Sequence, residues 1–380
     1  MIRKIVKLIN LAAFYIYNRI ASVILKINKK KAVFLSESHR ELDGNLKCVY
    51  DALPSDIEKK VHIKGDRRTK ENLLETFSIW YDMTTSGIIL LDDFYGLTSA
   101  IKVRKGQQIV QLWHGSGAYK KFGYSRQTTG DKIERVHSGY KKYTMAITSS
   151  EDIRGCYAEA FGIDISKVYA TGIPRTDIFF DEDKKKEISE RFFKEYPDLK
   201  DKKIVLFAPT YRGRKVEDAD YDFEYANLNL LTEELGEEYA VITKWHPALR
   251  NNIERNKVQA KHCSKVKDFS YYRDMNELLI VCDILVTDYS SIIFDYSLLN
   301  KPIVYFAYDK DEYANDRGLY YDFEEYLFGE VIECRHNLPE AILNEKIYEK
   351  NVERFYLKFM QSCKGVSSDK VVNYILKDLL

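Results

Sequence analysis

Short apolar stretches alternate with amphipathic ones along most of this chain, and that alternation is typical of a parallel β-sheet with crossover helices. Six stretches of strand character come first, at 32–38, 61–65, 87–92, 107–113, 145–149 and 167–172. Six more come after a gap, at 203–208, 239–245, 266–269, 284–287, 302–307 and 330–334. The pattern therefore predicts an α/β protein with two parallel sheets of similar size.

The gap between the two series indicates how the chain is divided. We expect a first α/β domain at 32–180 and a second at 203–365, joined by a charged, helix-prone connector at 181–202. A helix at 366–380 is expected to end the chain, and it could pack back on the first domain. With 380 residues, 45% of them hydrophobic, the chain is long enough for two such cores.

Residues 1–31 have a pattern of their own, in which apolar residues recur at helical spacing between basic ones. The apolar positions are Ile2, Ile5, Ile9, Ala12, Ile16, Ile20, Val23 and Ile27. Arg19 interrupts them before they reach the roughly 20 residues that cross a bilayer, and no cleavage site for secretion is present after them. The pattern favours a basic amphipathic helix on a membrane surface. Docking on the protein's own core and spanning the membrane are the alternatives.

The composition mainly argues against particular partners and sites. Lys and Arg total 59 against 58 Asp and Glu, so no overall field favours nucleic acid and we expect no such partner. Six cysteines lie far apart without a C-x-x-C pair, which argues against a zinc site or a disulfide scaffold and favours the reducing cytosol. Among the Asp-x-Asp pairs, only Asp309 and Asp311 come after a strand closely enough for a metal to be considered. We expect no metal.

The strand ends carry the candidate chemistry, because ligands of open parallel sheets bind beyond the carboxyl ends of the strands. His114 comes directly after the strand 107–113 in a Trp-His-Gly-Ser-Gly turn. The glycines allow close approach of the backbone, and a histidine can take up a proton near neutral pH. The alternative is a histidine that only bonds a loop carbonyl.

A second histidine, His246, comes directly after the strand 239–245 in Trp-His-Pro, where the alternative is a structural role in the turn before Pro247. The strand 203–208 runs into Pro209-Thr210-Tyr211-Arg212. An arginine fork there suits phosphate, although a solvated loop arginine is an equal alternative.

The strand 284–287 turns at once into an apolar helix through Asp288, Ser290 and Ser291. The serines are good N-caps, and a helix start with added hydroxyls accommodates an anion such as pyrophosphate. Capping alone is the alternative. Arg317 lies beyond the next strand and a loop, and could bring another cation to the same phosphates or lie solvated.

At these residues the sequence resembles the CDP-glycerol glycerophosphotransferase family of teichoic acid and capsule synthesis, over roughly residues 30–375. The matching motifs are 113–115 with 120–121, 208–213, 244–247, 287–291 and 301–305. The resemblance implies a GT-B architecture, with two Rossmann-like domains facing across a cleft and the donor nucleotide held mainly by the second. It also implies peripheral attachment at the cytoplasmic face of the cell membrane.

The resemblance also implies roles for particular residues. His114 would be the base for the acceptor hydroxyl, and His246 a second catalytic residue that contacts the donor phosphates. The acceptor side would include Gly115, Ser116, Lys120 and Lys121, and the donor phosphate and nucleotide site Pro209, Thr210, Arg212, Asp288, Ser290, Ser291 and Arg317. A hydroxyl of an undecaprenyl-linked disaccharide would attack the glycerol-bearing phosphorus of CDP-glycerol and release CMP, without cofactor or metal.

Residues 113–126 look more like the glycerol-phosphate primases of this family than like its polymerases. A polymerising glycerol- or ribitol-phosphate transferase is the first alternative. A sugar transferase of the same architecture, using a nucleotide sugar, and a non-catalytic membrane-bound nucleotide binder are more distant ones. The sequence leaves the oligomeric state open.

Overall fold

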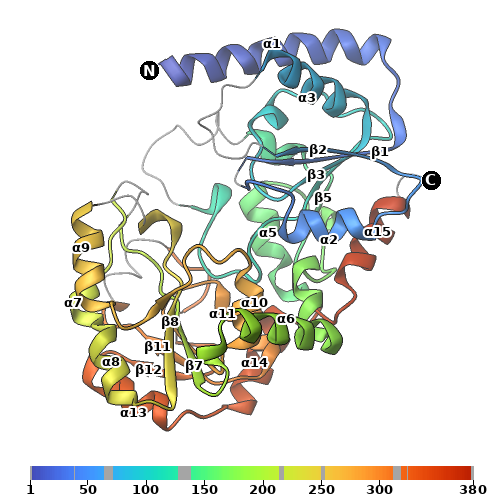
Figure 1. Ribbon diagram of the computed structural model, residues 1–380. Helices are drawn as coiled ribbons and strands as arrows, with labels where there is room; N and C mark the ends of the chain where they lie inside the picture. The colour runs from blue at the N-terminus through green and yellow to red at the C-terminus, as the bar shows by residue number, and fades with distance from the viewer. Residues whose placement is uncertain are drawn as a thin grey trace. The chain divides into compact units, whose positions relative to one another are not determined.

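The computed structural model describes residues 2–37, 39–63, 72–126, 138–213, 218–249, 253–310, 318–322 and 324–377. The chain forms two compact units. Unit 1 contains Met1–Asp177 and Gln361–Leu380, and unit 2 contains Ile178–Met360 (Figure 1). Each unit is built on its own six-stranded sheet.

The sheet of unit 1 is parallel throughout and has the strand order β2-β1-β3-β4-β5-β6. Its strands are β1 (Asn28–Ser36), β2 (Glu58–Ile63), β3 (Ser86–Leu91), β4 (Gln108–Gln111), β5 (Met145–Ile147) and β6 (Val168–Tyr169). Central strands such as β3 are buried over their whole length, which explains their uninterrupted apolar sequence. The chain reverses its direction of winding between β1 and β3, the position at which such sheets bind ligands.

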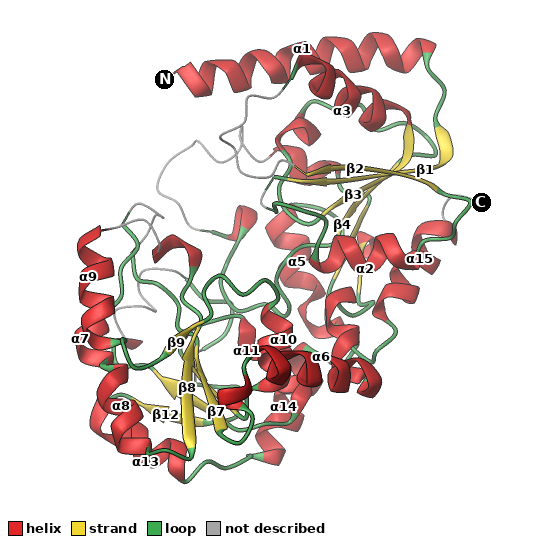
Figure 2. Ribbon diagram, in the orientation of Figure 1, coloured by secondary structure: helices red, strands yellow, loops and turns green. Residues whose placement is uncertain are grey.

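The helices of unit 1 are α1 (Ile2–Ile24), α2 (Gly44–Ala52), α3 (Leu73–Thr85), α5 (Arg154–Phe161) and α15 (Ser367–Lys377). Helices α1 and α3 lie side by side (Figure 2), and the Trp80 ring of α3 is 5.9 Å from the Phe14 ring of α1. Helix α15 comes from the end of the chain and lies against α2. The side-chain amide of Gln108 fixes it by donating to the Ile375 carbonyl at 2.9 Å.

The sheet of unit 2 is also parallel and has the order β12-β11-β10-β7-β8-β9. Its strands are β7 (Lys203–Phe207), β8 (Tyr239–Thr243), β9 (Lys267–Asp268), β10 (Ile284–Thr287), β11 (Ile303–Phe306) and β12 (Glu330–Ile332). Counted from β7, this is the 3-2-1-4-5-6 order of a doubly wound nucleotide-binding sheet, and its winding reverses between β7 and β10.

The helices of unit 2 are α6 (Glu182–Glu195), α7 (Phe223–Ala226), α8 (Leu228–Leu235), α9 (Ile253–His262), α10 (Met275–Val281), α11 (Ile292–Tyr296), α13 (Leu338–Leu343) and α14 (Glu349–Phe359). The segment 181–202 thus contains α6, which belongs to unit 2. Its N-cap is Asp181, whose side chain accepts from the Lys184 amide. The buried core beside β7 contains aromatic rings that pack edge-on, those of Phe207, Tyr221, Phe223 and Trp245.

All twelve strands predicted from the sequence are present, so the two-sheet α/β prediction is confirmed. Their ends differ from those expected. Strand β4 stops at Gln111 because the chain turns sharply at Trp113, whereas β1 begins four residues early because Asn28 pairs with Ser86 across an irregularity. The two sheets also differ in strand order, which hydrophobic pattern alone does not specify.

Candidate functional site

The Trp-His-Gly turn begins where β4 ends. Trp113 has a φ of +54°, in the left-handed region that bulky side chains rarely adopt. The buried amide of Asn45, on α2, holds this conformation by donating to the carbonyls of Leu112 at 3.2 Å and Trp113 at 2.8 Å. The Trp113 ring stacks on Phe122 at 4.8 Å. The peptide before His114 is therefore fixed from two sides.

The glycine and serine positions after His114 are also held by hydrogen bonds. The Tyr157 hydroxyl lies 3.3 Å from the Gly115 carbonyl and 2.8 Å from the Gly117 carbonyl, and Gly117 donates its amide to the Ser149 hydroxyl. Arg175 donates to the buried Ser116 hydroxyl at 3.1 Å. A turn held at so many points is pre-organised, as a site that must place one ring accurately requires.

His114 is exposed. The contacts of its ring indicate which of the two nitrogens carries the proton of the neutral imidazole. Its Nδ1 lies 3.1 Å from the backbone carbonyl of Asp92, which can only accept, so Nδ1 carries the proton. Nε2 then has the free lone pair, and among the described residues it makes no hydrogen bond. This is the tautomer that a general base needs.

Sequence reasoning missed two residues at this sheet edge: Asp92, whose carbonyl contacts the His114 ring, and His39, which contacts the Asp92 carboxylate. The Asp92 side chain is buried, and its Oδ2 lies 3.1 Å from Nε2 of His39. Burial raises the pKa of Asp92, and the positive charge of His39 opposes that rise. The signal that could have indicated Asp92 is an acidic pair, Asp92-Asp93, directly after a fully buried strand. Lys120 and Lys121, expected on the acceptor side, are half-buried in the same unit.

In unit 2, His246 is exposed beyond the end of β8, and its ring has the opposite tautomer. Nδ1 accepts the Ala248 amide at 3.1 Å, so the proton lies on Nε2. His246 is therefore a hydrogen-bond donor at Nε2, whereas His114 is an acceptor there. Tyr211, beyond β7, places its ring 4.6 Å from the His246 ring.

Arg212, expected to bind phosphate, is engaged by acidic side chains of unit 2. Its Nη1 donates to Asp288 Oδ2 at 2.8 Å and to the Thr210 carbonyl at 2.7 Å, and its Nη2 donates to Asp309 Oδ1 at 2.8 Å. Burial alone would lower the pKa of Arg212, but the two carboxylates outweigh it and raise that pKa. The phosphate role of Arg212 stays a prediction, because most of the fork already has partners.

Asp288 and the serines after it lie at the end of β10. Asp288 is fully buried and accepts the Thr210 amide at 2.7 Å as well as Arg212, so it joins the ends of β7 and β10. The next helix, α11, has only five residues. The Ser290 hydroxyl accepts the Ile292 amide at 3.4 Å, and Ser291 makes no side-chain cap. A helix this short contributes a weaker dipole than the sequence led us to expect.

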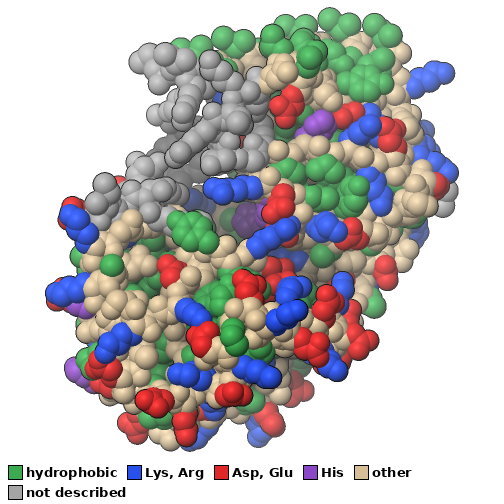
Figure 3. Space-filling model, in the orientation of Figure 1, with side chains coloured by type: hydrophobic (Ala, Val, Ile, Leu, Met, Phe, Trp, Pro, Cys, Tyr) green, Lys and Arg blue, Asp and Glu red, His purple; other side chains and the backbone are tan. Residues whose placement is uncertain are grey.

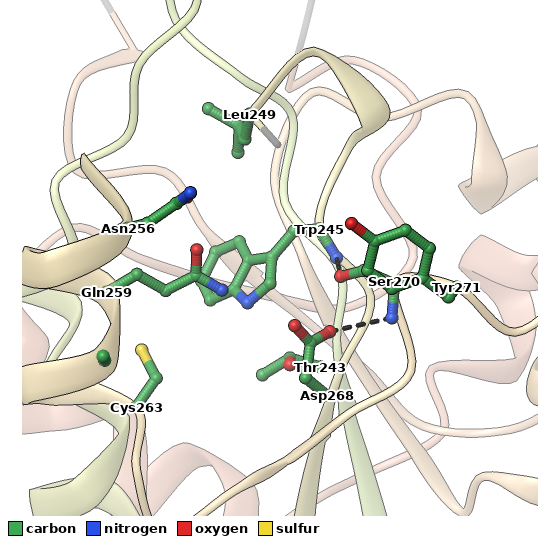
Figure 4. A pocket seen from close by; sticks show the side chains of 10 residues that line it. Thr243, Trp245, Leu249, Asn256, Gln259, Cys263, Asp268, Ser270 and Tyr271 are labelled. Carbon is green, nitrogen blue, oxygen red and sulfur yellow. Dashed lines mark hydrogen bonds between the residues drawn. The ribbon is translucent and has the colours of Figure 1, made fainter. Parts of the chain in front are cut away.

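Beside the β8 end, a cavity of about 350 Å³ is lined by residues of β8, β9 and α9 (Figure 4). The Trp245 indole N–H and the Thr243 hydroxyl are both buried on its wall, and neither has a hydrogen-bond partner among the described residues. The amides of Asn256 and Gln259 line the opposite side in Figure 4. Buried polar groups without partners favour a polar ligand or ordered water in this cavity.

The structure thus collects the predicted residues into two groups, one in each unit. His114, Gly115 and Ser116 share the turn of unit 1. Pro209, Thr210, Arg212 and Asp288 share the β7 and β10 ends of unit 2, with Ser290, Ser291 and His246 on neighbouring strand ends. Arg317 and Asp311 lie outside the described residues. Within the ranges that are described, no three acidic, histidine or cysteine side chains are grouped so as to hold a metal.

Comparison with known proteins assigns this chain to a family. A family model described as CDP-Glycerol:Poly(glycerophosphate) glycerophosphotransferase matches residues 16–377. The teichoic acid poly(ribitol-phosphate) polymerase of Bacillus spizizenii is 41% identical over 93% of this chain, which spans only 57% of that protein. The teichoic acid ribitol-phosphate primase of the same organism is 30% identical over 94% of this chain and 93% of its own. The teichoic acid glycerol-phosphate primase of Bacillus subtilis is 32% identical over 80% of this chain and 77% of its own.

Solved structures agree at the level of the fold. The wall teichoic acid polymerase TagF has a TM-score of 0.78 at 21% identity, over 100% of this chain and 96% of its own. MnaA of S. aureus with UDP has a TM-score of 0.55 at 14% identity, over 92% of this chain and 97% of its own. These likenesses confirm the predicted fold class, two parallel-sheet α/β domains of the GT-B kind. With the family model matching nearly the whole chain, this protein belongs to the family described as CDP-glycerol:poly(glycerophosphate) glycerophosphotransferase.

Proposed function

We propose that this chain transfers ribitol phosphate from a CDP-linked donor to a hydroxyl of a lipid-linked teichoic acid acceptor, with release of CMP. The family supports polyol-phosphate transfer, and the 41% identity with a ribitol-phosphate polymerase favours ribitol as the polyol. One observation of geometry carries the chemistry. The His114 ring is held with Nε2 as its proton-accepting nitrogen, at the ligand-binding edge of the unit 1 sheet.

In the proposed step the acceptor oxygen attacks the polyol-bearing phosphorus of the donor. Its proton passes to Nε2 of His114, and the bond from phosphorus to the CMP oxygen breaks. Nδ1 of His114 keeps its hydrogen bond to the Asp92 carbonyl throughout, so the ring turns little as it becomes charged. A base fixed in this way typically contributes roughly two to four orders of magnitude to the rate.

For the donor we propose a place on unit 2. The Nε2 proton of His246 suits a phosphoryl oxygen, because hydrogen bonds to ionised acceptors are the stronger kind. The cavity beside Trp245 would take the nucleoside part of the donor. A pyrimidine base requires both hydrogen-bond donors and acceptors. The cavity offers them through the Trp245 indole N–H, the Thr243 hydroxyl and the Gln259 amide.

Glycerol phosphate is the second candidate. The family description names glycerophosphate, and the glycerol-phosphate primase of Bacillus subtilis is 32% identical. This was our expectation from the sequence, and the higher identity of the ribitol enzymes makes it second. The number of units added to each acceptor is a separate question, since both primases and polymerases are among the relatives.

The test is to incubate the full chain with CDP-ribitol or CDP-glycerol and a lipid-linked disaccharide that carries one glycerol phosphate or none. We expect CMP release and ribitol-phosphate addition, with mass spectrometry giving the number of units added. Turnover of CDP-glycerol alone would replace ribitol by glycerol in the proposal. Release of a nucleoside diphosphate from a nucleotide sugar, without CMP from either donor, would contradict it.

Replacing His246 by asparagine is expected to raise the KM for the CDP-linked donor by about 30-fold, because one charge-assisted hydrogen bond to the donor is lost. Asparagine Oδ1 can still accept the Ala248 amide, so the turn stays in place while the Nε2 donor is removed. Glutamine at 246 restores a donor near that point and serves as the matched control. Equal donor KM values for both variants and the unaltered chain would show that His246 does not contact the donor.

We also propose that unit 1 attaches to the membrane surface through α1. Much of the apolar surface of this helix does not pack on the protein: Ile9, Ile16, Ile20 and Val23 are between 59% and 83% exposed. The helix is held to unit 1 by another face, where Phe14, Asn18 and Ala21 are buried. Figure 3 shows hydrophobic side chains gathered along α1. No helix of the described ranges is long and apolar enough to cross a membrane.

Helix α3 extends the same apolar surface. Leu73 and Leu74 are 75% and 76% exposed, and Phe77 also reaches solvent beside α1. Lys7, Arg19 and Lys26 are exposed on or just after α1, which suits anionic lipid headgroups. An exposed apolar face of this extent on a folded domain favours a lipid surface as its partner.

Changing Ile9, Ile16 and Ile20 together to serine is expected to lower binding to anionic phospholipid vesicles by more than about tenfold, since each side chain loses its transfer energy into the bilayer. Phe14 stays in place, so α1 remains docked. The matched control changes three exposed apolar residues of unit 2, Leu343, Ile347 and Leu357, to serine. Vesicle sedimentation measures both, and equal binding of the two variants would exclude α1 as the anchor.

A further inference from the structure

Asp92 is a buried acid with few partners. It comes directly after β3, and only 2% of its surface is exposed. Its carboxyl group faces Nε2 of His39, at 3.1 Å, and the hydroxyl of Ser36 at the end of β1. An ionised carboxylate in such a place costs much free energy unless a cation is near. The residue therefore needs an explanation beyond packing.

Asp92 also joins the two histidines of this edge. Its backbone carbonyl accepts Nδ1–H of His114, while its side chain contacts His39. The strands concerned, β1, β3 and β4, are neighbours in the sheet, so their carboxyl ends lie along one edge. The carboxylate and the His114 ring also interact electrostatically. One residue thus fixes the candidate base through its main chain and acts on its charge through its side chain.

The charge state of Asp92 depends on the groups around it. Burial raises the pKa of this carboxyl, and the neighbouring negative charge of Asp93 raises it further. His39, the Ser36 hydroxyl and His114 lower it. His39 is the only one of these that forms an ion pair with Asp92 within the described residues. Of the groups that lower this pKa, His39 has the largest effect.

We propose that Asp92 and His39 are positioning residues for His114. The Asp92 carbonyl sets the tautomer, and the Asp92 carboxylate, kept ionised by His39, offsets the positive charge that the His114 ring gains when Nε2 takes the acceptor proton. When CMP has left, that proton passes from Nε2 to solvent and the neutral tautomer returns. The inference rests on the proposed function, because it needs a reaction in which His114 takes a proton.

A purely structural role is the competing explanation, in which the His39–Asp92 contact only holds the loop after β1. The two explanations differ in what a substitution changes. Loss of a structural contact lowers stability and leaves the pH dependence of turnover in place. Loss of a charge that acts on His114 changes kcat and the pH dependence while the chain stays folded.

The first test replaces Asp92 by asparagine, which keeps the backbone carbonyl and the side-chain shape. We expect kcat to fall by about tenfold or somewhat more, on the order of one charge acting on a general base, with the acceptor KM nearly unchanged. A wrong tautomer typically costs roughly a thousandfold or more in kcat. The fall expected here is smaller, because the main chain of residue 92 still sets the tautomer of His114. An Asp92→Asn chain with unaltered kcat overturns the proposal.

Replacing His39 by glutamine keeps an N–H near Asp92 but removes the positive charge. The pKa of Asp92 should then rise further, since the opposing charge is gone. Activity that needs ionised Asp92 is lost as the pH falls through that pKa, so the acid side of the kcat profile should move to higher pH. In the double variant with Asp92→Asn, the His39 change should have no further effect. Equal acid limbs in the unaltered and His39→Gln chains overturn the proposal.

A measurement without turnover separates this inference from the proposed function. In the full chain labelled with ¹³C-aspartate, the Asp92 carboxyl signal is identified by its loss in Asp92→Asn and tracked with pH. We expect it to titrate above the ordinary aspartate range, and higher still in His39→Gln. Lys30→Gln, which removes the partner of the exposed Asp56, is the control and should leave the Asp92 signal unchanged. If no donor is turned over, the proposed function fails; if His39→Gln leaves the Asp92 titration in place, this inference fails.

Discussion

Replacing His114 by asparagine is expected to lower kcat for polyol-phosphate transfer by about three orders of magnitude, the contribution of a well-placed general base. Asparagine can still donate its side-chain N–H to the Asp92 carbonyl, as Nδ1 does, so the turn keeps its hydrogen bond. It has no group at the position of Nε2. The variant therefore removes the base and little else.

The measurement is the rate of CMP release at saturating donor and acceptor, with the melting temperature recorded alongside. His336 is exposed in the turn that follows β12, the edge strand of the unit 2 sheet, and is not among the candidate site residues. His336→Asn is therefore the matched control, expected to keep full activity. Donor binding to His114→Asn should be nearly unchanged, because the loss is confined to the chemical step. A kcat that stays close to that of the unaltered chain would mean that the acceptor hydroxyl loses its proton elsewhere.

The sequence predicted those parts of the fold and the site that depend on residues close together in the chain. It did not predict the contacts between residues that are far apart in the chain. Buried parallel strands are largely apolar, so β3, β10 and β11 were recognisable as short apolar runs in the sequence. The residues directly after such a strand must lie at the sheet edge, and His114 and His246 were found by that argument. Strands and the residues that follow them are set by consecutive residues, so the pattern of the sequence indicates them directly.

The partners of those residues are not local. Asn45 lies 68 positions before Trp113, and Asp309 lies 97 after Arg212, so no pattern in either segment indicates the contact. Arg212 was placed correctly at a strand end, but the carboxylates that engage it come from two other strand ends. The sequence likewise shows that Ser290 and Ser291 precede an apolar segment. It does not show that the helix lasts only five residues.

Replacing Arg212 by methionine is expected to lower the free energy of unfolding by about 3–5 kcal/mol, the usual cost of removing one member of a buried ion network. The side chain is 18% exposed, and Asp288 is fully buried. Without the guanidinium, two carboxylates face each other among the rings of Tyr221, Tyr289 and Tyr308. Methionine fills much of the same volume, so the loss comes from the uncompensated charge rather than from a cavity.

Urea unfolding of the full chain, monitored by far-UV circular dichroism, measures this loss. Arg191→Met is the matched control, because Arg191 forms an ion pair with Glu277 at the surface and its removal should cost less than about 1 kcal/mol. An Arg212→Met chain with full stability but a large rise in donor KM would contradict the internal role. It would show instead that the guanidinium turns outward to hold phosphate, as the sequence alone suggested.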